Sequence, residues 1–190
     1  MPRAGLSSAA VTQTGAALAD ETGLELLSMG LVAERLGVKT PSLYKHVDSI
    51  ADLTHRIGVL AMNELADAIR DAIAGRAASE ALFAAAQAMR TFVNEHPGRY
   101  DASNAARPTG PEDPLLPAAR RVLGSLSAAL GGFRLDPTHE IHALRMVRSM
   151  LHGFATLEHS GGFMIDTDID ESFTWMITLI DQGLKHSTKD

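Results

Sequence analysis

Hydrophobic residues recur every three or four positions along most of this 190-residue chain, which is the spacing of amphipathic helices. The pattern predicts a first helix over residues 7–21, ended by Gly23. Two shorter helices are expected over 28–36 and 41–47, and a long helix over 50–74. At 1.5 Å per residue the long helix would span roughly 37 Å, which is enough to link two domains.

In the second half of the chain hydrophobic residues also recur at helical spacing, in segments separated by residues that break helices. Helices are expected over 79–95, 115–130, 137–160 and 168–185, with glycine or proline near most of their ends. Residues 97–114 lack a strong period and are expected to be irregular, with room for one short helix. The sequence has no internal repeats and no alternating apolar and polar runs, so it predicts an all-α protein without a sheet.

The segment 28–47 has the organisation of two short helices joined by a turn. Gly37 supplies the bend, and Thr40 is predicted to cap the second helix with Pro41 at its first position. The positions expected on the buried side are Met29, Val32, Ala33, Leu36, Leu43 and Val47. The outward face is small, polar and basic, which is what a helix needs to enter the major groove of DNA. The alternative is an ordinary helical hairpin with a solvated outer face.

From this arrangement the segment predicts a set of DNA contacts. The predicted residues are Ser28, Lys39, Thr40, Pro41, Ser42, Tyr44, Lys45 and His46. Among them Thr40, Ser42 and Tyr44 are expected to face bases or the groove edge, whereas the basic residues and Ser28 mainly contact phosphate. A dimer would double this set and would match a palindromic site in double-stranded DNA.

Composition narrows the class of protein. With 45% hydrophobic and 21% charged residues the chain is globular, and with no cysteine it has neither disulfides nor thiolate chemistry. No apolar run reaches membrane-spanning length and no signal peptide opens the chain, so a cytoplasmic location without membrane contact is expected. The net charge of −6 argues against nonspecific nucleic-acid binding. The DNA-binding interpretation therefore depends on the local cluster of Lys39, Lys45 and His46.

Catalytic and metal-binding patterns are absent from the sequence. The eight histidines lack metal-ligand spacing, and we find no nucleophile–base arrangement and no glycine-rich phosphate loop. The acidic run from Asp166 to Glu171 lies at a helix start, where it interacts favourably with the helix dipole. We therefore expect no catalytic residue, no metal, no cofactor and no enzymatic activity.

The two C-terminal helices carry more apolar surface than one chain of this size is expected to bury, which favours a homodimer. The predicted dimer interface comprises Ile141, Leu144, Leu151, His152, Phe173, Ile177, Ile180 and Leu184. The alternative is a fully packed helical core within one chain. His152 is interpreted as a hydrogen-bonded core or interface residue, with a ligand-binding or proton-sensing role as the alternative.

An effector pocket is predicted within residues 79–164. Its predicted lining is Leu82, Met89, Phe92, Leu123, Met146, Met150 and Phe154. Because this set is apolar with few polar groups, the expected ligand is a mostly hydrophobic small molecule.

Two stretches resemble one known family. Residues 31–47, LVAERLGVKTPSLYKHV, resemble the DNA-binding unit of the tetracycline-repressor family, with matches at Ala33, Leu36, Gly37, Val38, Leu43, Tyr44 and His46. Residues 148–163, RSMLHGFATLEHSGGF, together with 168–173, resemble the C-terminal domain of the branch named for a Trp-His-Gly motif. In that stretch the His-Gly pair is present at His152-Gly153, whereas the tryptophan is not kept.

The resemblance implies an all-α, dimeric, ligand-responsive transcriptional regulator, usually a repressor released from a palindromic operator. The expected division is a helix-turn-helix DNA-binding domain of three helices over residues 1–50 and a helical-bundle domain for effector binding and dimerisation over 51–190. The chain departs from the family at Ile50, where a basic or polar residue is usual, and this weakens the expected phosphate binding. Two alternatives are a dimeric ligand-binding module with weak or no DNA binding and a small helical-bundle enzyme acting on an apolar substrate.

Overall fold

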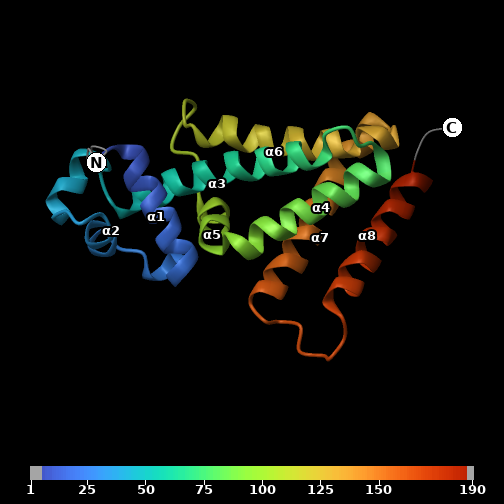
Figure 1. The fold of residues 1–190 in the computed structure, drawn as a ribbon. Coiled ribbons are helices and arrows are strands. Elements are labelled where there is room, and N and C mark those ends of the chain that lie inside the picture. The colour runs from blue at the N-terminus through green and yellow to red at the C-terminus, as the bar shows by residue number, and fades with distance from the viewer. Residues whose placement is uncertain (1–5, 188–190) are drawn as a thin grey trace. The chain divides into compact units, whose positions relative to one another are not determined.

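The computed structural model describes residues 6–187, and these residues form helices joined by short connections (Figure 1). The α-helices are α1 (Ser8–Thr22), α2 (Met29–Leu36), α3 (Ile50–Ile73), α4 (Ala78–Glu95), α5 (Pro97–Ala105), α6 (Leu115–Leu130), α7 (Pro137–His159) and α8 (Ile169–His186). Between them lie the 3₁₀ helices η1 (Leu24–Leu26), η2 (Thr40–Lys45) and η3 (Gly131–Phe133). No β-strand forms within residues 6–187, so the predicted all-α class is confirmed.

Residues 97–114 contain the one short helix for which the prediction left room, α5. Pro97 occupies the first position of α5, where a proline costs no hydrogen bond, and the helix buries Tyr100 and Ala102. Gly98 lies against α1: a Cβ atom at this position would be 2.1 Å from the carbonyl oxygen of Ala19. The Pro-Gly pair therefore follows the end of α4, as predicted, and starts a closely packed helix.

The chain forms two compact units. The first contains the residues up to Asn63 together with Glu95–Ala118, and the second contains Glu64–Asn94 together with the residues from Ala119 onward. The predicted DNA-binding domain, 1–50, falls inside the first unit, which also takes in the start of α3 and all of α5. The functional division at residue 50 stays a prediction.

The core of the first unit is built by α1, α2, η2, α5 and the start of α3. Its buried side chains are Val11, Ala16, Leu18, Ala19, Leu27, Met29, Val32, Ala33, Leu43, Val47, Leu53, Ile57 and Ala102. Hydrogen bonds add to this packing where α5 begins, because the Asp20 carboxylate accepts from the Arg99 backbone N–H at 2.9 Å. The two short helices of segment 28–47 are thus fixed to a rigid base.

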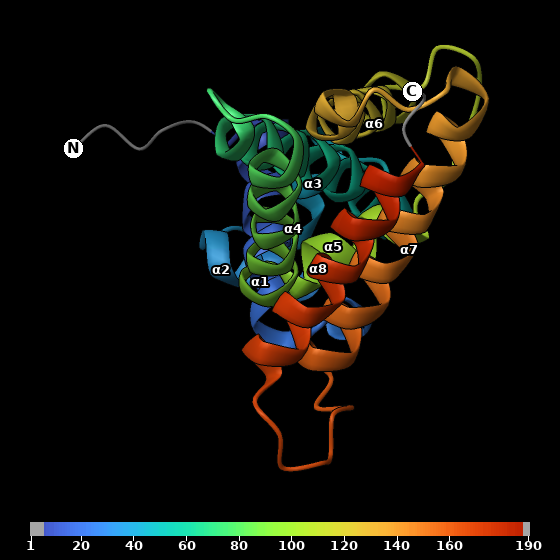
Figure 2. The ribbon, with the colours of Figure 1, turned by 90° about the vertical axis from the view of Figure 1, so that its right-hand side faces the viewer.

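In the second unit α7 and α8 run side by side in opposite directions (Figure 2). Six of the predicted interface residues are buried within the single chain: Leu144, Leu151, Phe173, Ile177, Ile180 and Leu184. Their assignment to a dimer interface is corrected, because they pack into the chain's own core. Ile141 and His152 are exposed, as are Met146, Leu157, Trp175 and Leu179 on the same two helices.

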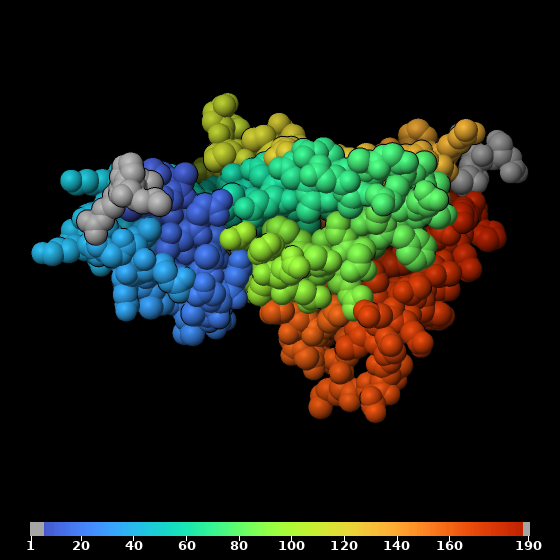
Figure 3. All heavy atoms as spheres, viewed as in Figure 1, coloured from blue at the N-terminus to red at the C-terminus, as the bar shows by residue number. Residues whose placement is uncertain are grey.

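An ion-pair cluster lies in the second unit and joins α4, α7 and α8. The Arg90 guanidinium donates to Glu158 through Nε at 2.7 Å and contacts Asp170 through Nη2 at 2.7 Å. It also lies 4.7 Å from the ring centroid of Phe173. The connection from α7 to α8 lies at the surface, in the orange-to-red region of Figure 3. Its residues Met164 and Ile165 are 92% and 83% exposed.

Candidate nucleic-acid interface

Residues 28–47, which we call the reading segment, begin with the capped helix α2. The Ser28 hydroxyl accepts from the backbone N–H of Leu31 at 3.3 Å, so Ser28 caps the helix. The helix ends at Gly37, whose φ of +66° is a left-handed conformation that favours glycine. The Val38 N–H then donates back to the carbonyl of Ala33 at 3.0 Å. The predicted bend at Gly37 is therefore present, together with the hydrogen bonds that close it.

The second short helix is the 3₁₀ helix η2, which is tighter than the predicted helix and ends before His46. The prediction that Thr40 caps this helix is wrong: Lys39 precedes the first residue, and no side chain caps the helix. The backbone closes the first turn itself, because the Ser42 N–H donates to the Lys39 carbonyl at 2.8 Å. Leu43 and Val47 are buried, as predicted.

All eight predicted DNA contacts lie on this segment at accessible positions. Ser28, Lys39, Pro41, Tyr44 and Lys45 are exposed, and Thr40, Ser42 and His46 are half-buried. No Asp or Glu occurs between Leu36 and Val47, so the charged side chains of this stretch are all basic. Duplex DNA presents regularly spaced negative charges, and a basic, carboxylate-free stretch complements them.

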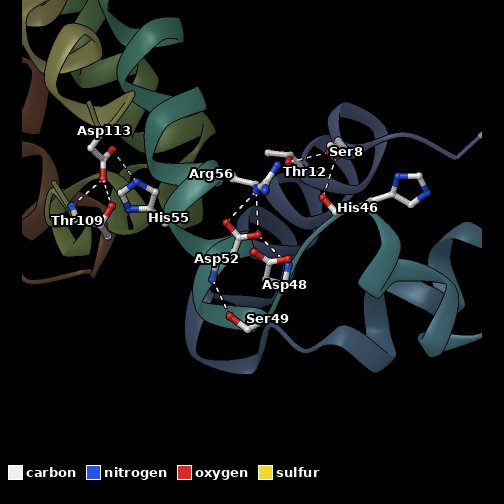
Figure 4. A network of polar contacts seen from close by, with 10 residues as sticks. All are labelled: Ser8, Thr12, His46, Asp48, Ser49, Asp52, His55, Arg56, Thr109 and Asp113. Atoms are coloured by element: carbon white, nitrogen blue, oxygen red, sulfur yellow. Dashed lines mark hydrogen bonds and ion pairs between the residues drawn. The ribbon is translucent and has the colours of Figure 1, made fainter. Parts of the chain in front are cut away.

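A hydrogen bond from α1 holds the far end of the reading segment, and further hydrogen bonds cap α3 directly after it (Figure 4). The Ser8 hydroxyl donates to the carbonyl of His46 at 2.8 Å. At the start of α3 the Ser49 hydroxyl accepts from the Asp52 N–H at 3.1 Å, and Asp52 in turn accepts from the Asp48 N–H at 2.9 Å. The Ser49-x-x-Asp52 spacing indicates such a cap in the sequence, whereas no local pattern links Ser8 to His46.

The Asp52 carboxylate is neutralised within the fold. Arg56, one turn further along α3, donates its Nε to Asp52 at 2.9 Å. Burial would raise the pKa of Asp52, but the hydrogen bonds from Arg56 and from the Asp48 N–H outweigh it, so the pKa is lowered. This carboxylate stays charged and paired beside the reading segment.

A second polar contact in the first unit holds the start of α6 against α3. The Asp113 carboxylate, 1% exposed, accepts from the Thr109 hydroxyl at 2.7 Å and from the Leu115 N–H at 2.8 Å. It also lies 2.9 Å from Nε2 of His55. The hydrogen bonds from Thr109, followed by those from Leu115 and His55, hold the pKa of Asp113 well below its usual range. The sequence gives no sign of this pairing, since His55 and Asp113 are far apart along the chain.

The predicted effector-pocket residues differ in their burial. Leu82, Met89 and Phe92 are buried and Met150 and Phe154 are half-buried, but Leu123 and Met146 are exposed. A cavity of about 420 Å³ lies under the α7–α8 connection, and none of the seven residues lines it. The predicted pocket stays a prediction.

Metal sites and membrane-spanning helices do not occur among the described residues. Between residues 6 and 187, no group of three or more His, Asp or Glu side chains is placed to hold a metal ion. In the same part of the chain, no helix combines the length and the apolar character needed to cross a membrane.

Comparisons with known proteins place both parts of the chain among transcriptional regulators. Residues 82–180 match the model of the tetracycline repressor-like C-terminal domain. An uncharacterised HTH-type transcriptional regulator of Mycobacterium tuberculosis is 34% identical over 184 residues, which cover 96% of this chain and 84% of that protein.

Solved structures share the fold. A protein of unknown function from Rhodococcus sp. RHA1 matches with a TM-score of 0.81 at 18% identity, covering 97% of this chain and 99% of that one. A TetR variant from Acinetobacter baumannii, in complex with minocycline, matches with a TM-score of 0.72 at 21% identity, covering 98% of this chain and 100% of that one.

Proposed function

Because this chain belongs to the tetracycline-repressor family of transcriptional regulators, we propose that it represses transcription as a homodimer bound to a palindromic operator. A hydrophobic small molecule releases it from the DNA. The observation that carries this proposal is the reading segment. Its stretch between Leu36 and Val47 carries basic side chains and no carboxylate, and it bends at Gly37. The buried side chains of Leu43 and Val47 fix this stretch to the core of the first unit.

In this proposal the reading segment enters the major groove. Thr40, Ser42 and Tyr44 contact base edges or the groove wall, and Lys39 and Lys45 bind phosphates. The hydrogen bond from Ser8 to the His46 carbonyl supports this role, because it limits movement of the contact residues relative to the rest of the unit.

The dimer is proposed to form through the outward sides of α7 and α8. The exposed Ile141 is kept from the predicted interface, and the buried residues of that prediction give way to other exposed apolar residues of the same helices: Met146, Leu157, Trp175 and Leu179. Trp175 is 67% exposed, and an exposed tryptophan among aliphatic side chains favours contact with another protein surface. A palindromic DNA site requires two copies of the chain, so the partner that covers this face is a second copy.

The effector is proposed to bind in the second unit near Leu82, Met89 and Phe92. The related TetR variant crystallised with minocycline supports a small-molecule ligand for this chain. Helix α3 begins in the first unit and ends in the second. A conformational change caused by effector binding in the second unit can therefore reach the first unit through this helix. Reciprocity then requires that operator DNA weaken effector binding by the factor by which effector weakens DNA binding.

Fluorescence anisotropy on labelled DNA from the chain's own upstream region, measured across a salt series, tests the proposal. Lys45→Ala is expected to weaken binding to all sequences and to lower the slope of log K against log salt by about one. Arg120→Ala removes an exposed positive charge from α6 in the second unit and should leave the slope unchanged. If the wild-type chain bound no fragment of this DNA even at low salt, a dimeric ligand-binding module without DNA binding would be the better interpretation.

A further inference from the structure

A cavity of about 370 Å³ lies inside the first unit, between α1 and α3. Its apolar wall is formed by Ala9 of α1, Val59 and Leu60 of α3, and Pro114. This cavity belongs to the same unit as the reading segment and shares no residue with the predicted effector pocket. A ligand bound here would contact α1 and α3, which hold the reading segment, although no residue of 28–47 lines the cavity.

The polar part of the wall is complementary to an anion. The ionisable residues that line the cavity are His55 and Arg56, and no carboxylate lines it. Arg56 uses Nε to bind Asp52, which leaves its two terminal nitrogens without a hydrogen-bond partner among residues 6–187. The Gln13 side chain, which also lines the cavity, likewise makes no hydrogen bond within the described part of the chain.

We propose that this cavity binds a small organic carboxylate with an apolar body. The carboxylate accepts from the terminal nitrogens of Arg56 and from the Gln13 amide, a charge-assisted arrangement that a neutral ligand lacks. The apolar body lies against Ala9, Val59 and Leu60. Both parts are needed, because the lining is mostly apolar and also includes the donors of Arg56 and Gln13.

Occupation of the cavity is coupled to the reading segment through α1. Ser8 lines the cavity, and its hydroxyl donates to the carbonyl of His46 at 2.8 Å. Thr12, also in the wall, donates to the Ser8 carbonyl at 2.9 Å, so the two contacts form one chain (Figure 4). A ligand that moves this turn of α1 changes the support of His46. Any effect on DNA affinity rests on the function proposed above, but the binding itself does not.

Titration of the full-length protein with 4-fluorobenzoate, followed by ¹⁹F NMR and by ¹H–¹⁵N spectra of the protein, tests the site. We expect the amide signals of Ser8, Thr12, Arg56 and His46 to shift in proportion to occupancy. The neutral isostere 4-fluorobenzamide should bind about tenfold more weakly, because it lacks the charge-assisted contact with Arg56. Acetate, which lacks the apolar body, should compete poorly.

Two variants localise the binding. Ala9→Phe fills the cavity from an exposed helix position and should abolish binding, whereas Ala128→Phe makes the same change on the exposed face of α6 and should not affect it. Arg56→Gln should weaken 4-fluorobenzoate about tenfold and leave 4-fluorobenzamide unchanged. If Ala9→Phe does not fold, the comparison of 4-fluorobenzoate with 4-fluorobenzamide on Arg56→Gln tests the site instead.

Three results would overturn the proposal. The first is wild-type affinity in Ala9→Phe, the second is a set of shifts confined to the second unit, and the third is competition by acetate as strong as that by 4-fluorobenzoate itself. Because the measurement uses no DNA, failure here is distinguishable from failure of the proposed DNA binding.

Discussion

Replacing Glu158 by glutamine removes one charge from the ion-pair cluster of the second unit and should destabilise the protein markedly. The side chains of Arg90 and Glu158 are 10% and 16% exposed, so the pair is largely shielded from water. After the substitution Arg90 keeps Asp170 as a partner, but the Asp170 side chain is 81% exposed and cannot replace the lost carboxylate in the shielded position. The guanidinium would remain against the rings of Phe154 and Phe173 without its main counter-charge.

Removing one member of a buried ion pair costs about 3–5 kcal/mol, because the other charge stays desolvated. The remaining contact with Asp170 and the attraction to the ring of Phe173 put the expected loss at the lower end, about 3 kcal/mol. At about 2–4 °C per kcal/mol for a chain of this size, the unfolding midpoint should fall by roughly 6–12 °C.

Thermal and urea unfolding followed by circular dichroism measures this loss. Glu171→Gln is the matched control, since Glu171 is exposed on α8 and its substitution should change stability by less than about 0.5 kcal/mol. The double variant Arg90→Met, Glu158→Leu should recover most of the loss, because an apolar pair leaves no unpaired charge. A midpoint within about 2 °C of wild type for Glu158→Gln would show that the cluster does not stabilise the fold.

The same cluster predicts a pH dependence. The hydrogen bonds from Arg90 lower the pKa of Glu158, so its folded pKa lies below the unfolded value of about 4.3. The stabilisation by the carboxylate is therefore present above about pH 4.3 and is lost as the pH falls through the folded pKa. The difference in stability between wild type and Glu158→Gln should shrink over that acidic range.

Three further predictions follow from single positions. Gly98→Ala should lower stability by about 1–3 kcal/mol or more, because the new Cβ meets a backbone carbonyl of α1, whereas Gly124→Ala on open α6 should raise it by about 0.5–1 kcal/mol. Leu179→Asp should convert the proposed dimer to a monomer of 20.2 kDa in sedimentation, whereas the control Thr174→Asp should remain a dimer. A persistent dimer in Leu179→Asp would exclude the exposed side of α7 and α8 as the interface. Ile50→Lys should tighten DNA binding at low salt and steepen the salt dependence by about one unit; an unchanged slope would place this position away from phosphate.

Helix positions and the family were predictable because their signals are local. Gly23 and Gly37 stop α1 and α2 at positive φ, and such stops are visible in the sequence without tertiary information. The motif within 31–47 led to the tetracycline-repressor family, which the comparisons confirm, and to an assignment as a regulator without enzymatic activity. The Trp-His-Gly branch stays a prediction.

The features that the sequence did not predict are those that tertiary contacts determine. Pro97-Gly98 ends α4 as predicted, but the sequence does not show that α5 packs so closely against α1 that only glycine fits at the contact. Leu151 and Ile177 lie on apolar stripes, and a stripe predicts burial without telling which chain provides the cover. The polar contacts Ser8–His46, His55–Asp113 and Arg90–Glu158 join residues far apart in sequence, so no spacing rule identifies them.

The placement of charge resolves the conflict between a net charge of −6 and a DNA-reading function. Two carboxylates of the first unit are paired with arginines: Asp52 binds Arg56, and Glu21 binds Arg35 of α2 at 3.0 Å. Asp48, which directly follows Val47, is exposed. Between Leu36 and Val47 the chain has no acidic residue, so Lys39 and Lys45, the proposed phosphate contacts, have no competing carboxylate in their own stretch. Exposed charges further than about 10 Å away are screened at ordinary salt, so this local balance, more than the total charge, sets phosphate binding. With few cations available, each phosphate contact carries a large share of the affinity, which is why the salt slope of Lys45→Ala is the measurement most sensitive to the proposed role.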